Sequence, residues 1–208
     1  MKVDHLKWGQ KITLRDGTVT PGVPCEELEY ERHRFPRNVS QWTVADLGTL
    51  DGFWAVEAKN GGAEVVAFDW MDRPTARLVL GDYGIPYVTG HDLNVPINWP
   101  HRYVLVLFYG ILYHLKNPMQ GLVNAWNLVE PDGLLIVESA CQTLDCARIP
   151  DDVAAMWIPP NGYYDDRSNY CMPNKAGLRQ MCAHLDGCEQ FDEIFTGGRM
   201  TIVCHKKI

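Results

Sequence analysis

Short apolar runs alternate with amphipathic segments along most of the chain. The runs have the length and composition of buried parallel strands, and they lie at 44–47, 65–68, 86–88, 103–108 and 134–137. Between them, apolar side chains recur at helical spacing, which predicts helices over 53–60, over 74–83 and from 118 onward. Two last runs, 189–195 and 200–204, flank Gly197-Gly198 and predict an antiparallel hairpin.

This order of elements predicts the α/β fold class, with a doubly wound sheet closed by the C-terminal hairpin. The run 103–108 is nearly all apolar, so we expect it at the centre of the sheet. Ligands of such sheets bind at the carboxyl ends of the strands, where the polar residues discussed below follow their strands.

Several helix ends carry the residues that favour them. Pro74 and Pro118 fall in predicted first turns, and Asn117 precedes the second of them as a cap. Gly84 follows a predicted helix end. Asn174 is expected to cap a further helix, whose apolar face consists of Leu178, Met181, Cys182 and Leu185.

The whole chain, 1–208, is expected to form one domain with two additions. Residues 1–40 form an N-terminal arm with a helix over 24–35, and Asp16-Gly17 predicts a hairpin turn in the arm. Residues 139–173 are rich in Pro, Asp, Asn and Tyr and lack a regular period. Long irregular insertions in compact domains are often functional, so we interpret this segment as a lid over the substrate.

The segment 44–69 combines a strand, a glycine turn, a helix and a second strand, and it ends on a carboxylate. Gly48 and Gly52 bracket a turn in which backbone approaches a ligand closely. Asp69 lies about 20 residues beyond the turn, where an acid usually binds the hydroxyls of a ribose. The pattern therefore predicts a nucleoside site.

The spacing within the turn favours one class of cofactor. A dinucleotide site uses G-x-G-x-x-G, whereas this chain has G-x-x-x-G with Leu50 in place of the middle glycine and Asp51 beside it. Leu50 and Asp51 suit an adenosyl cofactor with a cationic sulfonium better than a pyrophosphate. A structural βαβ unit without ligand and an NAD-type oxidoreductase remain the alternatives.

Four motifs together resemble one group of enzymes. The turn resembles motif I of class I S-adenosylmethionine-dependent methyltransferases. V-L-F-Y-G-I-L-Y-H-L-K-N-P at 106–118 is similar to the segment after strand four in the wobble-uridine tRNA carboxymethyl/methyl transferases and their smaller relatives. W-G-Q-K-I-T-L-R-D-G-T-V-T-P-G at 8–22 and D-R-S-N-Y-C-M-P-N at 166–174 resemble further segments of that group.

The resemblance implies a seven-stranded, Rossmann-like fold that binds S-adenosyl-L-methionine, with no metal. It places Gly48, Thr49 and Gly52 beneath the methionine part, Asp69 at the ribose and Asp92 at the adenine. The full set of implied cofactor residues is Asp46, Gly48, Thr49, Gly52, Asp69, Trp70, Asp92, Leu93 and Tyr109.

Tyr113 and His114 are the candidates for catalysis. One of them would orient or deprotonate the acceptor, since histidine ordinarily suits general-base chemistry near neutral pH; packing roles are the alternative. Glu138, at the end of the fifth strand, and Asn169 and Tyr170 are the candidates for contact with the acceptor.

Composition narrows the class of partner. The chain has 208 residues and a formal net charge of −7, which argues against a nucleic-acid surface without excluding a local basic patch. Its seven cysteines form no C-x-x-C pair, and the N-terminus has no apolar h-region, so we expect reduced thiols in the cytoplasm. The apolar stretch 103–112 is too short to span a membrane.

These observations predict a methyltransferase that acts on a small-molecule or sugar-like acceptor. The alternatives are an RNA (tRNA) methyltransferase and a catalytically idle, methyltransferase-like binding subunit. The pattern carries no prediction of oligomeric state.

Overall fold

The computed structural model describes residues 5–25, 27–142, 149–150, 152–162 and 166–207. Its main sheet has seven strands in the order β3-β2-β1-β4-β5-β9-β8. These strands are β1 (Thr43–Leu47), β2 (Glu64–Asp69), β3 (Tyr87–Thr89), β4 (Tyr103–Tyr109), β5 (Val129–Ala140), β8 (Cys188–Thr196) and β9 (Arg199–Lys206). The helices are α1 (Glu27–His33), α2 (Phe53–Asn60), α3 (Pro74–Tyr83), α4 (Pro118–Leu128), α5 (Lys175–Ala183) and the 3₁₀ turn η1 (Leu112–His114).

The strand order makes the fold doubly wound. β1 to β5 are parallel, β9 runs antiparallel to β5, and β8 runs antiparallel to β9. The chain winds outward from β1 to β3 and then returns to place β4 on the other side of β1. The carboxyl ends of β1 and β4 therefore lie at the switch point, where doubly wound sheets bind their ligands. This confirms the predicted fold class, including the central place of β4 and the C-terminal hairpin.

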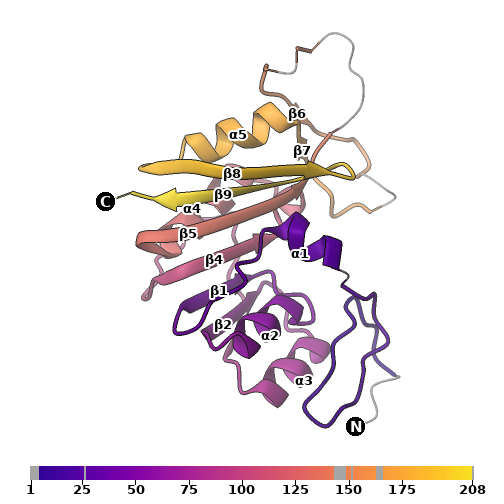
Figure 1. Ribbon diagram of the computed structural model, residues 1–208. Helices are drawn as coiled ribbons and strands as arrows, with labels where there is room; N and C mark the ends of the chain where they lie inside the picture. The colour runs from indigo at the N-terminus through magenta and orange to yellow at the C-terminus, as the bar shows by residue number, and fades with distance from the viewer. Residues whose placement is uncertain (1–4, 26, 143–148, 151, 163–165, 208) are drawn as a thin grey trace.

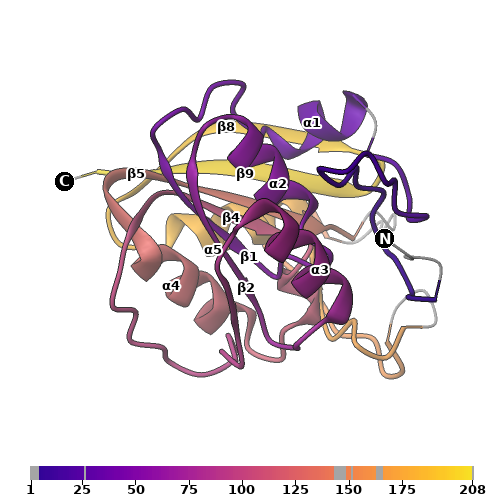
Figure 2. The same ribbon diagram turned by 90° about the horizontal axis from the view of Figure 1, so that it is seen from below.

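Helices cover both faces of the sheet. Figures 1 and 2 show α4 and α5 on one face and α1 and α2 on the other. One buried cluster joins the sheet to α4 and α5 through residues such as Leu122 and Leu178. A second joins it to α2 and α3 through Val56 and Leu80. The two layers hold the carboxyl ends of the strands in fixed positions.

The predicted helix ends are confirmed by their capping contacts. The Asn117 side chain accepts from the backbone amide of Gln120, and Pro118 opens α4. The Asn174 side chain accepts from the amide of Gly177 at 2.7 Å. Gly84 ends α3 with a φ of 64°, in the left-handed region that glycine adopts at little cost.

Two boundaries differ from the prediction. β5 begins at Val129 rather than at residue 134, and the added part contains an irregularity in which Asp132 has a φ of 68°. α1 ends at His33 rather than continuing to residue 35, because Arg34 leaves the helical region with a φ of 53°.

The described part of the segment 139–173 includes the end of β5 and a separate two-stranded sheet. Its first residues continue β5, and β6 (Met156–Trp157) pairs with β7 (Met172–Pro173) as a small antiparallel sheet. Parts of the predicted lid, 143–148, 151 and 163–165, lie outside the described residues. Its role as a lid stays a prediction.

Candidate functional site

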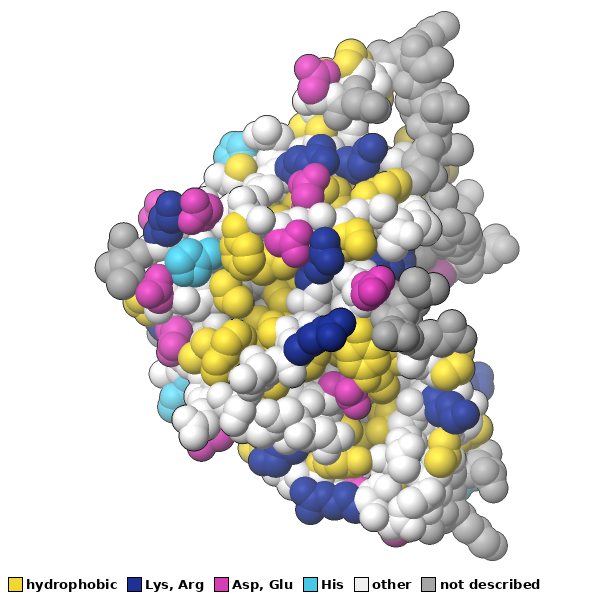
Figure 3. Space-filling model, in the orientation of Figure 1, with side chains coloured by type: hydrophobic (Ala, Val, Ile, Leu, Met, Phe, Trp, Pro, Cys, Tyr) yellow, Lys and Arg dark blue, Asp and Glu magenta, His cyan; other side chains and the backbone are white. Residues whose placement is uncertain are grey.

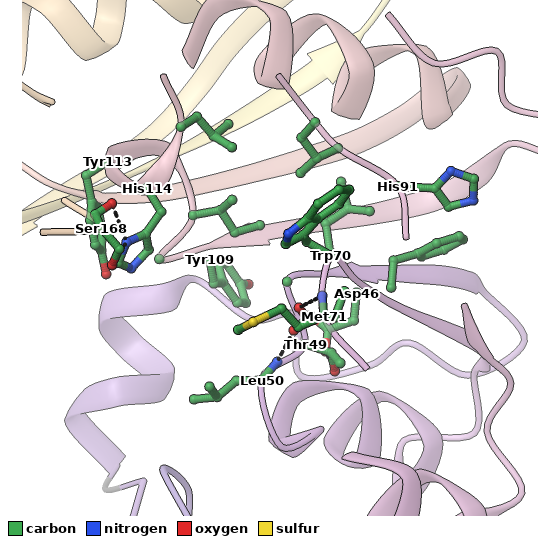
Figure 4. Close-up of a pocket in the computed structure, with 18 of the residues that line it drawn as sticks. Asp46, Thr49, Leu50, Trp70, Met71, His91, Tyr109, Tyr113, His114 and Ser168 are labelled. Atoms are coloured by element: carbon green, nitrogen blue, oxygen red, sulfur yellow. Dashed lines mark hydrogen bonds between the residues drawn. The ribbon is translucent and has the colours of Figure 1, made fainter. Parts of the chain in front are cut away.

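One cavity of about 770 Å³ opens at the carboxyl ends of the central strands. Every residue that the sequence analysis assigned to the site lines this cavity, except Gly52 and Asn169. Figure 4 shows Tyr113 and His114 at one end, Asp46 and Thr49 in the middle, and His91 at the other end. The predicted catalytic residues and the predicted cofactor residues other than Gly52 thus line one continuous cavity.

Asp69 lies at the end of β2 and is held by the turn beneath it. One carboxylate oxygen accepts from the amide of Met71 at 3.0 Å. The other accepts from the amide of Leu50 at 3.3 Å and from Arg73 Nε at 3.3 Å. These contacts fix the carboxylate at the cavity wall and leave one of its roughly four lone-pair sites, on the oxygen bonded to Met71, for a hydroxyl donor.

Asp46 is a buried acid at the centre of the cavity wall. Its side chain accepts from the Thr49 hydroxyl at 2.6 Å and from the backbone amide of Ala55, in the first turn of α2. Burial raises the pKa of Asp46 to about 7, although both hydrogen bonds oppose the shift. A cationic group placed beside Asp46 would favour its ionised form.

Three positions of the glycine turn have a positive φ. Gly48 has a φ of 63°, and a Cβ there would lie 2.8 Å from Ile111. Leu50 adopts a φ of 56° although it carries a side chain. Gly52 has a φ of 102°, but a Cβ there would meet Leu80 of α3 at 2.9 Å rather than the cavity. The structure therefore places Gly52 at the contact between α2 and α3, and not beneath a ligand.

Asp51 turns away from the cavity and binds the N-terminal arm. One of its oxygens accepts from the amides of Gly9 at 2.6 Å and Gln10 at 2.8 Å. The other accepts from the Thr75 hydroxyl at 2.6 Å. Asp51 thus serves to dock the arm on the turn and does not contribute charge to the cavity wall.

Aromatic rings surround the end of the cavity near β3. The His91 ring lies 4.8 Å from Trp99, and Phe68 lies 5.3 Å from Trp99, both measured between ring centroids. Asp92 stabilises a turn, since one of its oxygens accepts from the amide of Asn94 at 2.9 Å. It also lines the cavity, as Leu93 beside it does.

A buried asparagine, which the sequence analysis did not single out, holds this loop. The side-chain amide of Asn124 donates to the carbonyls of Leu93 and Val95, and its backbone carbonyl accepts from the Trp99 indole. Asn124 interrupts the apolar face of α4, and that interruption was the available signal.

Tyr109 connects the cavity wall to α1. Its hydroxyl donates to the carbonyl of His33 at 2.9 Å, and its ring packs against Trp54 and His33. Burial, with Asp46 and Glu138 nearby, raises the pKa of Tyr109 well above its usual value. The phenol is therefore neutral and structural.

Trp70 also lines the cavity and is 60% exposed at its mouth.

His114 is oriented by the segment 166–170. Its Nδ1 lies 3.1 Å from the carbonyl oxygen of Ser168, and the Ser168 hydroxyl donates to Asp166 at 2.7 Å. A carbonyl only accepts, so Nδ1 is the donor in this contact, and in the neutral ring this leaves a lone pair on Nε2. Figure 4 shows the His114 and Ser168 side chains in contact. This tautomer is the one that a proton acceptor needs.

Glu138 is a buried partner of Arg199, and not a free carboxylate. Both Glu138 oxygens accept from the Arg199 guanidinium, which also donates to the Tyr113 hydroxyl at 3.2 Å. Burial lowers the pKa of Arg199, but its bonds to Glu138 outweigh burial and hold that pKa above its usual value. The pair fixes the Tyr113 hydroxyl beside Gly110, which has a φ of 68°.

The other two acceptor candidates differ in place. Tyr170 lines the cavity, with the Lys116 ammonium 5.2 Å from its ring centre. Asn169 does not line it, and its backbone amide donates to the carbonyl of Asp166. Several other residues line the cavity although no sequence pattern assigned them to the site, namely Gln10, His33, Arg73, His91, Ser168 and Arg199.

The described residues contain no group of three or more His, Cys, Asp or Glu side chains arranged to hold a metal ion. The same part of the chain has no helix long and apolar enough to span a membrane.

Comparison of folds relates the chain to known methyltransferases. The 1,6-didemethyltoxoflavin-N1-methyltransferase of Burkholderia thailandensis, solved with 1,6-didemethyltoxoflavin and S-adenosylhomocysteine, is similar with a TM-score of 0.62 and 13% identity. The match covers 81% of this chain and 72% of that one. The N-methyltransferase NodS of Bradyrhizobium japonicum, in complex with S-adenosylhomocysteine, has a TM-score of 0.61 and 12% identity over 87% of this chain and 88% of its own.

A third structure shows why fold alone does not assign the activity. A Rhodobacter sphaeroides protein provisionally named as a Zn-dependent alcohol dehydrogenase has a TM-score of 0.66 and 15% identity, covering 88% and 91% of the two chains. No protein-family model and no curated protein matches the sequence. The comparisons therefore establish the Rossmann-like fold that methyltransferases share, and the activity is argued from the site.

Proposed function

We propose that the protein is an S-adenosyl-L-methionine-dependent methyltransferase. The observation that carries the proposal is the meeting of three carboxylates in one cavity. Asp46, Asp69 and Asp92 stand at or beyond the ends of the consecutive strands β1, β2 and β3 and line the same wall. They offer acceptors for an ammonium group, for ribose hydroxyls and for an adenine amino group, and rings such as Trp99 flank the adenine end.

The first turn of α2 discriminates against a phosphate-bearing cofactor. Dinucleotide sites place a pyrophosphate on the free amides of this helix end. Here the Phe53 amide donates to the Gln10 side chain, and the Ala55 amide bonds to Asp46. An adenosyl cofactor with a cationic amino-acid tail fits this set of donors and acceptors, whereas a pyrophosphate would meet the Asp46 carboxylate.

The bound cofactor would supply an electrophilic methyl group. The residues of the chain would then position the acceptor beside Gly110 and against Tyr113 and His114, which the segment 166–170 supports from behind. His114 Nε2 would accept the proton of an acceptor hydroxyl, and the Tyr113 hydroxyl, fixed by Arg199, would orient it. We infer that residues 139–173 act as the lid, because Ser168 and Tyr170 form part of the cavity wall.

We further propose a small-molecule or sugar-like acceptor. The cavity reaches from the adenine end to the Tyr113 end as one space, which leaves room beside the cofactor for a compact molecule. The similar B. thailandensis protein is named for methyl transfer to a small molecule, 1,6-didemethyltoxoflavin, which agrees with this size of acceptor.

Calorimetry with the purified protein tests the cofactor assignment. We expect S-adenosylmethionine and S-adenosylhomocysteine to bind, and NADH and NAD⁺ not to bind. Asp69→Ala should weaken S-adenosylhomocysteine binding at least about tenfold, because each charge-assisted bond to a ribose hydroxyl contributes roughly 1.5–3 kcal/mol. Asp72→Ala, an exposed acid nearby, is the control and should bind normally. Binding of NADH, or an Asp69→Ala variant with unchanged affinity, would refute the assignment.

A further inference from the structure

The arm segment, residues 8–23, folds on itself before it reaches the cavity. The amide of Lys11 donates to the carbonyl of Val23 at 2.8 Å, and the amide of Val23 donates to the carbonyl of Gly9. Gly22 packs so closely on Gln10 that a Cβ there would lie 2.2 Å from the Gln10 backbone. This pairing fixes the backbone of Gln10.

Contacts to α2 and α3 then dock the arm segment. The amides of Gly9 and Gln10 both donate to Asp51. Farther along, the Tyr83 hydroxyl donates to the carbonyl of Thr13, and the amide of Arg15 donates to Asp82 at 2.7 Å. These contacts hold the arm segment against the glycine turn and α3, and Gln10 is the residue of the arm segment that lines the cavity.

The oxygen of the Gln10 side-chain amide is hydrogen-bonded to the described residues, and its nitrogen is not. Its Oε1 accepts from the amides of Asp51 at 3.3 Å and Phe53 at 3.2 Å, which assigns the oxygen of the side-chain amide to the helix end. Gln10 lines the cavity. Within the described part of the chain, its Nε2 has no hydrogen-bond partner, so two N–H donors remain for a ligand.

Gln10 and Asp46 flank the same helical turn. Gln10 bonds to the amide of Phe53, and Asp46 bonds to the amide of Ala55, two residues further along α2. These two amides are about 3 Å apart along the helix axis, and both side chains line the cavity, so they lie at neighbouring points of its wall. Gln10 presents hydrogen-bond donors and Asp46 presents a carboxylate. Together they are complementary to a ligand in which a carboxylate stands next to an ammonium group.

We propose that Gln10 Nε2 binds the carboxylate of the cofactor's amino-acid tail, while Asp46 binds its ammonium group. This inference rests on the proposed function and extends it. The arm segment would then be part of the cofactor site, and Gln10 would contact the amino-acid tail and not the adenosine.

Paired ligands separate this role from a structural one. S-adenosylhomocysteine carries the amino-acid tail, and 5′-methylthioadenosine lacks it. Gln10→Glu keeps an oxygen for the helix end but replaces the two donors by a second carboxylate oxygen. We expect calorimetry to show S-adenosylhomocysteine binding weakened at least about tenfold and 5′-methylthioadenosine binding changed less than about twofold.

Two more variants complete the experiment. Gln180→Glu makes the same charge change on the exposed side of α5, on the opposite face of the sheet, and should bind both ligands normally. Gln10→Ala should show the same selective loss as Gln10→Glu and carries the test if Gln10→Glu fails to fold, which thermal melting without ligand reports.

The outcomes are distinct. Unchanged binding of S-adenosylhomocysteine to both Gln10 variants would overturn the inference. An equal loss of both ligands would also overturn it, because Gln10 would then act only by holding the turn. Wild-type protein that binds neither ligand would instead refute the proposed function itself, and the inference with it.

Discussion

At the residue scale, the most informative group is the buried acid Asp46. An exposed aspartate has a pKa near 3.8, and burial raises that of Asp46 to about 7 in the folded chain. Between these two values the folded state binds more protons than the unfolded state. The free energy of unfolding that Asp46 contributes is therefore fully present below about pH 4 and is lost as the pH rises through about 7.

Asp46→Asn tests this linkage in the ligand-free protein. The amide cannot ionise, so the melting temperature of the variant should fall less than that of the wild type between pH 4 and pH 7.5. Thermal melts across this range measure the two slopes. Equal slopes would mean that Asp46 ionises normally and that its environment is more polar than its burial indicates.

His114 is the residue on which the proposed chemistry depends. Its hydrogen on Nδ1 is fixed by the Ser168 carbonyl, so Nε2 is the atom that accepts a proton. We expect His114→Ala to lower kcat about 10²-fold once an acceptor is found by screening metabolite pools with labelled cofactor. Affinity for S-adenosylhomocysteine should hardly change, because the ring lies at the far end of the cavity from His91. Near-normal turnover in the variant would leave positioning alone as the mechanism.

At the scale of elements, Gly52 shows how a turn residue serves packing. A side chain there would require a φ of 102° and would press on the buried Leu80. The first effect costs about 1–2 kcal/mol and the second about 1–3 kcal/mol. We therefore expect Gly52→Ala to lower the free energy of unfolding by both amounts, measured by urea titration.

Gly84 provides the matched control for this experiment. It has a φ of 64° at the end of α3, and nothing lies within 4 Å of a Cβ placed there. Gly84→Ala should therefore show the backbone cost alone. Equal losses in the two variants would contradict a role for Gly52 in the contact between α2 and α3.

Most helix ends could be predicted from the sequence because they depend on residues close by in the chain. The ends of α2, α3 and α4 coincide with glycine, proline and asparagine signals that act within a few residues. Within the arm segment the predicted Asp16-Gly17 turn is also local, since the Thr18 amide donates to Asp16 and Gly17 has a φ of 84°. The placement of Gln10 in the cavity has no such local cause, because it depends on Asp51, which the arm meets only when it docks on α2.

At the scale of the whole molecule, the strand order decides what the sequence could reveal of the site. Asp46, Asp69 and Asp92 lie at or just beyond the ends of their own strands. The glycine-turn pattern predicted Asp69, and the resemblance to methyltransferases, which rests on the same local motifs, predicted Asp46 and Asp92. Arg199 reaches Glu138 only because β9 inserts beside β5, and no spacing in the sequence expresses that pairing. Residues that come from a local motif were therefore predicted, and residues that come from topology were not.

The distribution of charge on the molecule argues against RNA as the methyl acceptor. The formal net charge is −7, and Figure 3 shows basic and acidic side chains interspersed on the face it presents. Several surface arginines are paired with acids, as in Arg179 with Glu193 and Arg34 with Asp192. Non-specific binding of nucleic acid depends on cations that are free to displace counterions from phosphates.

We expect the protein to bind tRNA more weakly than about 10⁻⁴ M at physiological salt, below the usual range for non-specific binding. Fluorescence anisotropy with labelled, unfractionated tRNA measures this, and a repeat at low salt is the control for residual charge attraction. A micromolar affinity that falls steeply with salt would contradict the prediction. It would show that the described cations gather on a surface that tRNA phosphates recognise, and it would favour RNA over a small molecule as the methyl acceptor.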